Sequence, residues 1–145
     1  MNGDEINEDT CKLAVSGGNF EIIHLCEQKG LQFENCLSIS SMFHRFEIFE
    51  WLNTHFEYEE IPLAKFIKFY NEPLFYSYSL SGSNIETKNE RGSTPINRAS
   101  FNGSIEVVKY LYETCHAKVD DKAINNASSN GHFEIKEYLS RCLKK

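Results

Sequence analysis

Apolar residues recur along this chain three or four positions apart, which is the spacing of an amphipathic helix. One short pattern, a polar residue followed by an apolar residue, a glutamate and another apolar residue, appears four times. Its copies begin at Asn19, Arg45, Ser104 and His132, and a weaker match begins at Asn71. Because a recurring unit of roughly 20 to 50 residues is typical of repeat proteins, the chain is predicted to contain about five similar units.

Each copy has the features of a helix start. Asn19 and Ser104 belong to the residue types that cap free backbone N–H groups, and the glutamate two places later favours the positive end of the helix dipole. Apolar residues follow at helical spacing, as in Phe46, Phe49 and Leu52. The pattern therefore predicts a helix with one apolar face at each copy.

A shorter helical segment rich in small residues precedes each of the four clear copies. These segments span residues 11–16, 38–43, 95–101 and 122–129. Gly17, Gly18, Gly103 and Gly131 lie between the two helices and supply the positive φ that tight turns often need, and Gly82 fits a further repeat turn. A pair of antiparallel helices this small cannot bury its apolar face alone, so the pairs are expected to stack into an all-α solenoid.

Residues 82–111 resemble an ankyrin repeat closely. In that family a T-P-L-H-x-A stretch opens the first helix, G-x-x-E-[IV]-V opens the second, and a β-hairpin finger joins neighbouring repeats. Thr94-Pro95 matches the first motif, whereas Ile96 and Asn97 replace its leucine and histidine. The physical reasons for the motif hold here, since threonine caps a helix and proline is tolerated in its first turn.

The other repeats are shorter than those of a conventional ankyrin protein. Their copies lie 26 to 28 residues apart, instead of about 33, and the missing residues are those of the finger. This arrangement resembles a divergent ankyrin branch that has lost most of its fingers. It implies a single ankyrin-repeat domain over residues 1–145, an α-solenoid with one well-formed β-hairpin finger near residues 85–93. The expected repeats cover approximately residues 10–34, 35–60, 61–82, 83–119 and 120–143.

The resemblance also implies a function. Ankyrin repeats bind other proteins on their concave side, which is built from finger tips and from exposed positions late in each first helix. The resemblance thus implies a non-catalytic protein–protein interaction module that binds another protein, with the partner's identity open. Carried over by position, the partner-binding residues are Glu90, Arg91, Ser93, Phe101, Asn102, Ser129 and Asn130.

Two aromatic features allow alternative interpretations. Phe101 is either an exposed aromatic residue beside an arginine, as in an interface hot spot, or it packs on Phe69 or Tyr70 of the preceding repeat. The aromatic segment 66–78 is either the core of a degenerate repeat, which is favoured, or a peptide-binding patch. Trp51 is expected in the core. A structural alternative to partner binding is self-assembly through the aromatic segment of this middle repeat.

A catalytic role is the second alternative, and it lacks support in the sequence. The five histidines are scattered, and Cys115 and His116 cannot point at one metal from a single helix face. No G-x-x-x-x-G-K-[ST] or G-x-G-x-x-G motif is present. We therefore expect no enzyme activity, no cofactor and no metal site. A persistently bound metal or a thiol of low pKa would be needed to revive this alternative.

Composition and charge narrow the remaining choices. The chain has 145 residues and a net charge of −6, which favours one folded unit and opposes contact with nucleic acid or anionic lipid. No signal peptide or membrane-spanning stretch is visible, and the basic segment 136–145 is better explained as a solvated capping face than as a nucleic-acid arm. The expected protein is monomeric and cytoplasmic, with a nuclear location as the alternative.

The five cysteines are odd in number and widely spread, and they form no C-x-x-C motif. This pattern argues against a disulfide framework or a zinc module, so reduced thiols that pack as small apolar residues are expected. These cysteines are Cys11, Cys26, Cys36, Cys115 and Cys142.

Overall fold

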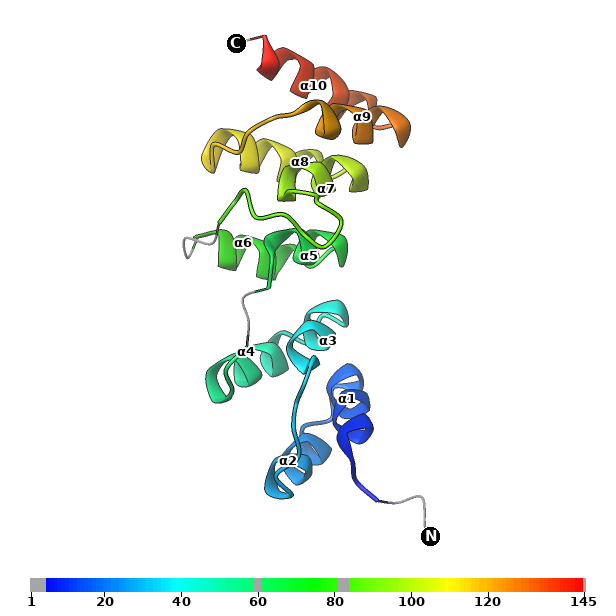
Figure 1. Cartoon of the computed structure of the whole chain (residues 1–145), viewed down its shortest axis with the longest axis vertical. Helices are drawn as coiled ribbons and strands as arrows, with labels where there is room; N and C mark the ends of the chain where they lie inside the picture. The colour runs from blue at the N-terminus through cyan, green and yellow to red at the C-terminus, as the bar shows by residue number, and fades with distance from the viewer. Residues whose placement is uncertain (1–4, 59–60, 81–83, 145) are drawn as a thin grey trace. The chain divides into compact units, whose positions relative to one another are not determined.

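The computed structural model describes residues 5–58, 61–80 and 84–144, and the fold of these residues is all-helical, as predicted (Figure 1). No strand occurs among them. In chain order the helices are α1 (Glu8–Gly17), α2 (Phe20–Gln28), α3 (Cys36–Met42), α4 (Phe46–His55), α5 (Leu63–Lys68), α6 (Glu72–Leu80), α7 (Pro95–Asn102), α8 (Ile105–Lys109), which continues as a π-helical turn (Tyr110–Thr114), α9 (Asp121–Ser129) and α10 (Phe133–Leu143).

The chain divides into two compact units, which we call unit 1 (residues 1–61) and unit 2 (residues 62–145). Unit 1 contains α1 to α4, and unit 2 contains α5 to α10. Consecutive helices pack as pairs: α1 with α2 and α3 with α4 in unit 1, then α5 with α6, α7 with α8 and α9 with α10 in unit 2. That all of residues 1–145 form a single ankyrin-repeat domain stays a prediction.

Neighbouring pairs within each unit pack mainly through their first helices. In unit 1, α1 contacts α3; in unit 2, α7 lies between α5 and α9 and packs on both. The second helices α8 and α10 also contact each other. Unit 2 therefore has two layers, a first-helix layer of α5, α7 and α9 and a second-helix layer of α6, α8 and α10 (Figure 1).

One backbone hydrogen bond closes the turn of every helix pair in the same way. The backbone N–H of the residue before the second helix donates to the carbonyl five residues earlier. The residue directly before the donor has a positive φ, which is the Schellman arrangement. These bonds are Asn19 to Ala14, Arg45 to Ser40, Asn71 to Phe66, Ser104 to Ala99 and His132 to Ala127, with N···O distances of 2.8 to 3.1 Å. The pair α5–α6, which has the weakest sequence signal, thus has the same turn as the others.

The expected glycine turns are confirmed at three places and need correction at a fourth. Gly18, Gly103 and Gly131 have φ values of 78°, 83° and 75°. Gly17 was expected in the same role but is the last residue of α1, because a Schellman turn needs only one residue with positive φ. Gly82 lies outside the described residues.

The caps also confirm one prediction and correct another. The side chain of Asn19 accepts a hydrogen bond from the backbone N–H of Ile22, as expected. Ser104 was expected to cap α8 but makes no such bond. Its ψ is 84°, whereas Thr94, which does cap α7, has a ψ of 165°. The short serine side chain does not reach the helix N–H groups from that backbone conformation, while the longer Asn19 side chain does at a similar ψ of 94°.

Large apolar side chains fill the interior of each unit. In unit 1 Ile23, Phe49 and Leu52 are fully buried. In unit 2 Phe66 and Phe75 are fully buried, so part of the aromatic segment 66–78 is core, whereas Tyr70 in the same segment is 62% exposed. Trp51 was expected in the core but is only half-buried, in an aromatic group of unit 1 with Phe33 and Phe56. None of the described helices combines the length and apolar character needed to cross a membrane.

Candidate functional site

The loop before α7 ends in a tight turn organised by Asn89. The side-chain oxygen of Asn89 accepts hydrogen bonds from the backbone N–H groups of Arg91 and Ser93, at 2.9 and 3.0 Å. Its backbone N–H donates to the carbonyl of Ser93, and Gly92 has a φ of 73°. Residues 84–94 contain this turn but no strand, so the predicted β-hairpin finger is not confirmed.

Two lysines from the flanking first helices touch this turn. Nζ of Lys65 on α5 lies 3.3 Å from Oε1 of Glu90, and Nζ of Lys122 on α9 donates to the carbonyl of Gly92 at 3.1 Å. The turn of residues 89–93 is therefore next to the first-helix layer. Glu90 and Arg91 are exposed, whereas Ser93 is half-buried and is held by its backbone.

A network of amides fixes the start of α7. Thr94 and Asn97 form a reciprocal capping box, in which each side chain accepts a hydrogen bond from the other's backbone N–H. Asn97 Nδ2 also donates to Oδ1 of Asp120 at 2.7 Å, and Asp120 in turn caps α9. Asn97 thus supplies both an acceptor, which caps α7, and a donor, which joins α7 to α9.

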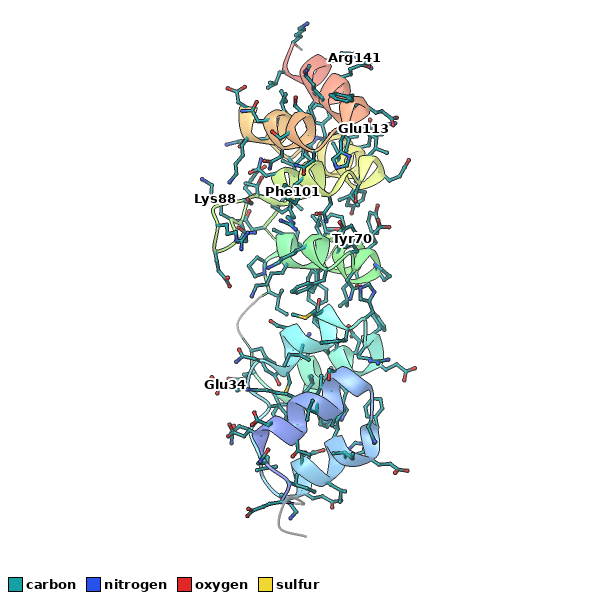
Figure 2. All side chains as sticks on the ribbon, turned by 90° about the vertical axis from the view of Figure 1, so that its right-hand side faces the viewer. Glu34, Tyr70, Lys88, Phe101, Glu113 and Arg141 are labelled. Carbon is teal, nitrogen blue, oxygen red and sulfur yellow. The ribbon has the colours of Figure 1, made fainter. Side chains whose placement is uncertain are left out.

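Phe101 on α7, labelled in Figure 2, is 41% exposed. The guanidinium carbon of Arg98 lies 4.6 Å from the centre of its ring. This geometry favours the interpretation of Phe101 as an exposed aromatic residue beside an arginine. Arg98 Nε is buried and makes no hydrogen bond within the described part of the chain. Arg98 is not among the partner-binding residues that the resemblance implies, although its spacing of three residues from Phe101 places the two on one helix face.

The remaining three candidates differ in accessibility. Asn102 is half-buried, and its Nδ2 donates to the carbonyl of Ile67 on α5 at 2.7 Å, so its amide joins two helices of the same unit. Ser129 and Asn130 are exposed at the end of α9. Asn130 uses its Nδ2 to bond the carbonyl of Asn126 at 2.8 Å.

Equivalent positions on the first helices of unit 2 are found by counting back from the residue before each second helix, which is Asn71, Ser104 or His132. The side chain three residues earlier, on α5, α7 or α9, is exposed in each case. The side chain six residues earlier is polar and half-buried. We call these six residues the first-helix face: Lys68, Phe101 and Ser129, then Lys65, Arg98 and Asn126. Lys65 and Lys68 were missed because the sequence of the middle repeat has no clear motif from which to count.

Comparison with known proteins identifies the family. Residues 1–78, more than half of the chain, match the family described as Domain of unknown function (DUF3447). The chain belongs to the DUF3447 family. No curated protein matches it. The DUF3447 match covers α1 to α5 and most of α6, so α7, its preceding loop and α9 lie beyond the matched residues.

The two helix layers of unit 2 in this DUF3447 member differ in charge. The first-helix layer contains four cationic side chains and one acidic side chain, whereas the second-helix layer, with its π-helical turn, contains three cationic and five acidic side chains. The cations of the first-helix layer are Lys65, Lys68, Arg98 and Lys122. Lys88 and Arg91 on the adjoining loop are exposed as well, and Figure 2 shows Lys88 extending away from the helices.

Two buried cysteines of unit 1 and one small cavity of unit 2 are further candidates for a reactive group or a bound ligand. Desolvation by burial raises the pKa of Cys11 to about 12 and that of Cys36 to about 11, which is the opposite of an activated thiol. In the described ranges no three potential ligand side chains gather as they would around a metal ion. A cavity of about 10 Å³ beside Ile67 and Phe75 has room for about one water molecule.

Proposed function

We propose that this chain is a non-catalytic, ankyrin-type protein-binding module that recognises another protein through the first-helix face of unit 2 and the neighbouring turn of residues 89–93. The observation that carries the proposal is Phe101, 41% exposed and stacked under Arg98 at 4.6 Å. Phenylalanine and arginine are both enriched at protein–protein interfaces, and arginine is also enriched among the residues that dominate binding energy.

The ankyrin-type solenoid is supported by recurrence. Five helix pairs share one closing hydrogen bond and one positive-φ position, and within each unit the pairs pack first helix to first helix. In this proposal residues 84–94 are the one finger of the array. Such stacking holds side chains in place before a partner arrives, so little conformational freedom is lost on binding.

Self-assembly through the aromatic middle repeat is the weaker alternative. Phe66 and Phe75 are fully buried, so these two rings are not available for contact with a second molecule. We accordingly propose a monomer. The five free cysteines fit a reducing, cytoplasmic or nuclear compartment.

A pull-down from cell extract tests the proposal. We would immobilise the full chain, its Phe101→Ala variant and a Phe133→Ala control, and identify the retained proteins by mass spectrometry. Phe133 is a matched control because it is 62% exposed in unit 2 but belongs to the second-helix layer. We expect the wild type and Phe133→Ala to retain a protein that Phe101→Ala does not. Equal retention by all three would contradict the proposed face, with circular dichroism confirming that each variant is folded.

A further inference from the structure

Charge is distributed unevenly along the chain as well as across unit 2. Unit 1 has 12 acidic and three basic residues, a net charge of −9, whereas unit 2 has nine acidic and 12 basic residues, a net charge of +3. The two values add to the chain's −6. The negative net charge of the whole chain therefore hides a basic unit. The excess of cations lies in the first-helix layer, because the adjoining loop has two basic and two acidic residues.

The acidic side chains near this layer are largely occupied by contacts within unit 2. Glu90 pairs with Lys65, and Glu86 Oε1 accepts a hydrogen bond from the backbone N–H of Lys118 at 2.8 Å. Asp120 accepts from Asn97 and from the N–H of Ala123. Among the cations, Lys68, Lys88 and Arg91 are exposed, whereas Lys65 and Arg98 are half-buried. The helices α5, α7 and α9 together carry one acidic side chain, Asp121.

We propose that the first-helix face of unit 2 binds an acidic peptide segment that also carries an aromatic or aliphatic side chain. Carboxylates of the peptide pair with Lys68 and Arg98, and its apolar side chain packs on Phe101. Lys65, which pairs with Glu90, adds positive charge beside them. Arg98 joins the two halves of the site because it presents a guanidinium beside the exposed ring. This inference rests on the proposed function and names the chemical class of the partner.

A peptide fits these observations better than a nucleic acid. Duplex DNA carries about one phosphate charge per 1.7 Å of its axis, and its binding needs many cations. Unit 2 has a net charge of only +3, in a chain whose net charge is −6. A short acidic segment needs only the few cations of one face, and its apolar side chain explains why an aromatic ring is exposed among them.

The test uses the full chain and a phage-displayed library of random peptides of roughly 12 residues, a length that lies across one domain face. We expect the enriched peptides to be rich in Asp and Glu and to contain Leu, Phe, Tyr or Trp. Enrichment of neutral or basic peptides, or no enrichment, would overturn the inference. If a Phe101-dependent protein is still captured from extract in that case, the proposed function stands while the peptide class fails.

Variants locate the binding face. An enriched peptide, labelled with fluorescein, is titrated with the wild type, with Lys65→Gln/Lys68→Gln and with Arg98→Gln, and its affinity is measured by fluorescence anisotropy. The matched control is the triple variant Lys109→Gln/Lys136→Gln/Arg141→Gln, which removes the three cationic side chains of the second-helix layer. We expect at least about 10-fold weaker binding for each first-helix variant, and a change within about twofold for the control. Thermal melting checks that the variants are folded, and the double lysine variant keeps the test independent of the stacked Arg98. Equal effects of both sets would overturn the placement.

Two further measurements exclude other occupants. A single-stranded oligonucleotide that displaces the peptide as effectively as an unlabelled peptide would make the face a general polyanion site and overturn the inference. Light scattering in low and high salt tests binding of the acidic unit 1 of a second copy. We expect a monomer mass throughout, and a salt-sensitive rise in mass with protein concentration would assign the face to self-association instead.

Discussion

The turns at Gly103 and at Tyr70 are closed by the same backbone hydrogen bond, but the positive φ that each turn requires is adopted by a glycine in one and by a tyrosine in the other. Both central residues have positive φ, 83° and 55°. A Cβ added to Gly103 would lie 2.7 Å from Nδ1 of His132, whereas the side chain of Tyr70 is accommodated with 62% of its surface exposed. Glycine is therefore required where another part of the unit covers the turn, and an ordinary L-residue is tolerated where the turn is open.

The side chain that covers a glycine turn comes from the next helix pair. His132, the residue before α10, has its Nε2 3.2 Å from the carbonyl of Phe101. In unit 1, Arg45 occupies the same position before α4, and its Nε donates to the carbonyl of Ser16 at 3.0 Å while its guanidinium lies over Gly18. In each case the carbonyl belongs to the residue three positions before the N-cap of the second helix, which is Asn19 in unit 1 and Ser104 in unit 2. The glycine thus makes room for a link between neighbouring pairs.

The largest effect is expected from Gly103→Ala. The substitution combines a strained positive φ with overlap against the His132 ring, so we expect the free energy of unfolding to fall by about 2–4 kcal/mol. Gly131→Ala is the matched control, because its φ is 75° but a Cβ there has nothing within 4 Å. The control is expected to cost about 1–2 kcal/mol. Urea denaturation measures both, and equal losses would show that the cover by His132 is unimportant.

The next effect is the coupling between Gly103 and His132. In a His132→Ala background, Gly103→Ala loses its steric conflict, so its cost should fall to about 1–2 kcal/mol, the value expected for Gly131→Ala. His132→Ala alone should cost about 0.5–1.5 kcal/mol through its lost contact with the Phe101 carbonyl. A double-mutant cycle in urea gives the coupling energy. An unchanged cost of Gly103→Ala in the variant background would break the comparison.

The smallest effect is expected at the open turn of Tyr70. Tyr70→Gly relieves the positive-φ strain but increases the freedom of the unfolded chain, so we expect the free energy of unfolding to change by no more than about 1 kcal/mol. Thermal melting of the variant beside the wild type is sufficient. A loss well above this range at Tyr70 would mean that its side chain supports the core more than its exposure indicates.

These turns also explain how much of the fold could be predicted from the sequence. Glycine at positions 18, 103 and 131 indicates positive φ directly, so those turns were predicted. His44 and Tyr70 give no such signal, because the conformation there is set by the packing of the flanking helices. Only the 26-residue spacing from Arg45 to Asn71 pointed to the middle turn. The π-helical turn after α8 has no sequence signal that we recognise.

The candidate site was predictable to a similar extent. Phe101 and Ser129 could be placed because their repeats contain recognisable motifs, whereas Lys65 and Lys68 could be placed only after the α5–α6 turn was seen. The inward direction of Asn102, whose amide bonds the carbonyl of Ile67, depends on how α7 packs on α5. Side-chain direction of this kind is a tertiary property that local sequence does not encode.

The unequal charges of the two layers also give unit 2 an electric dipole. It points from the layer of α6, α8 and α10, which has an excess of acidic side chains, toward the layer of α5, α7 and α9, which has an excess of cations. In the proposed complex, the electric field of an acidic partner exerts a torque on this dipole before any contact forms, which favours approach by the first-helix face. On that proposal the same lysines govern the rate of encounter, which falls with ionic strength, and Phe101 governs the lifetime of the complex.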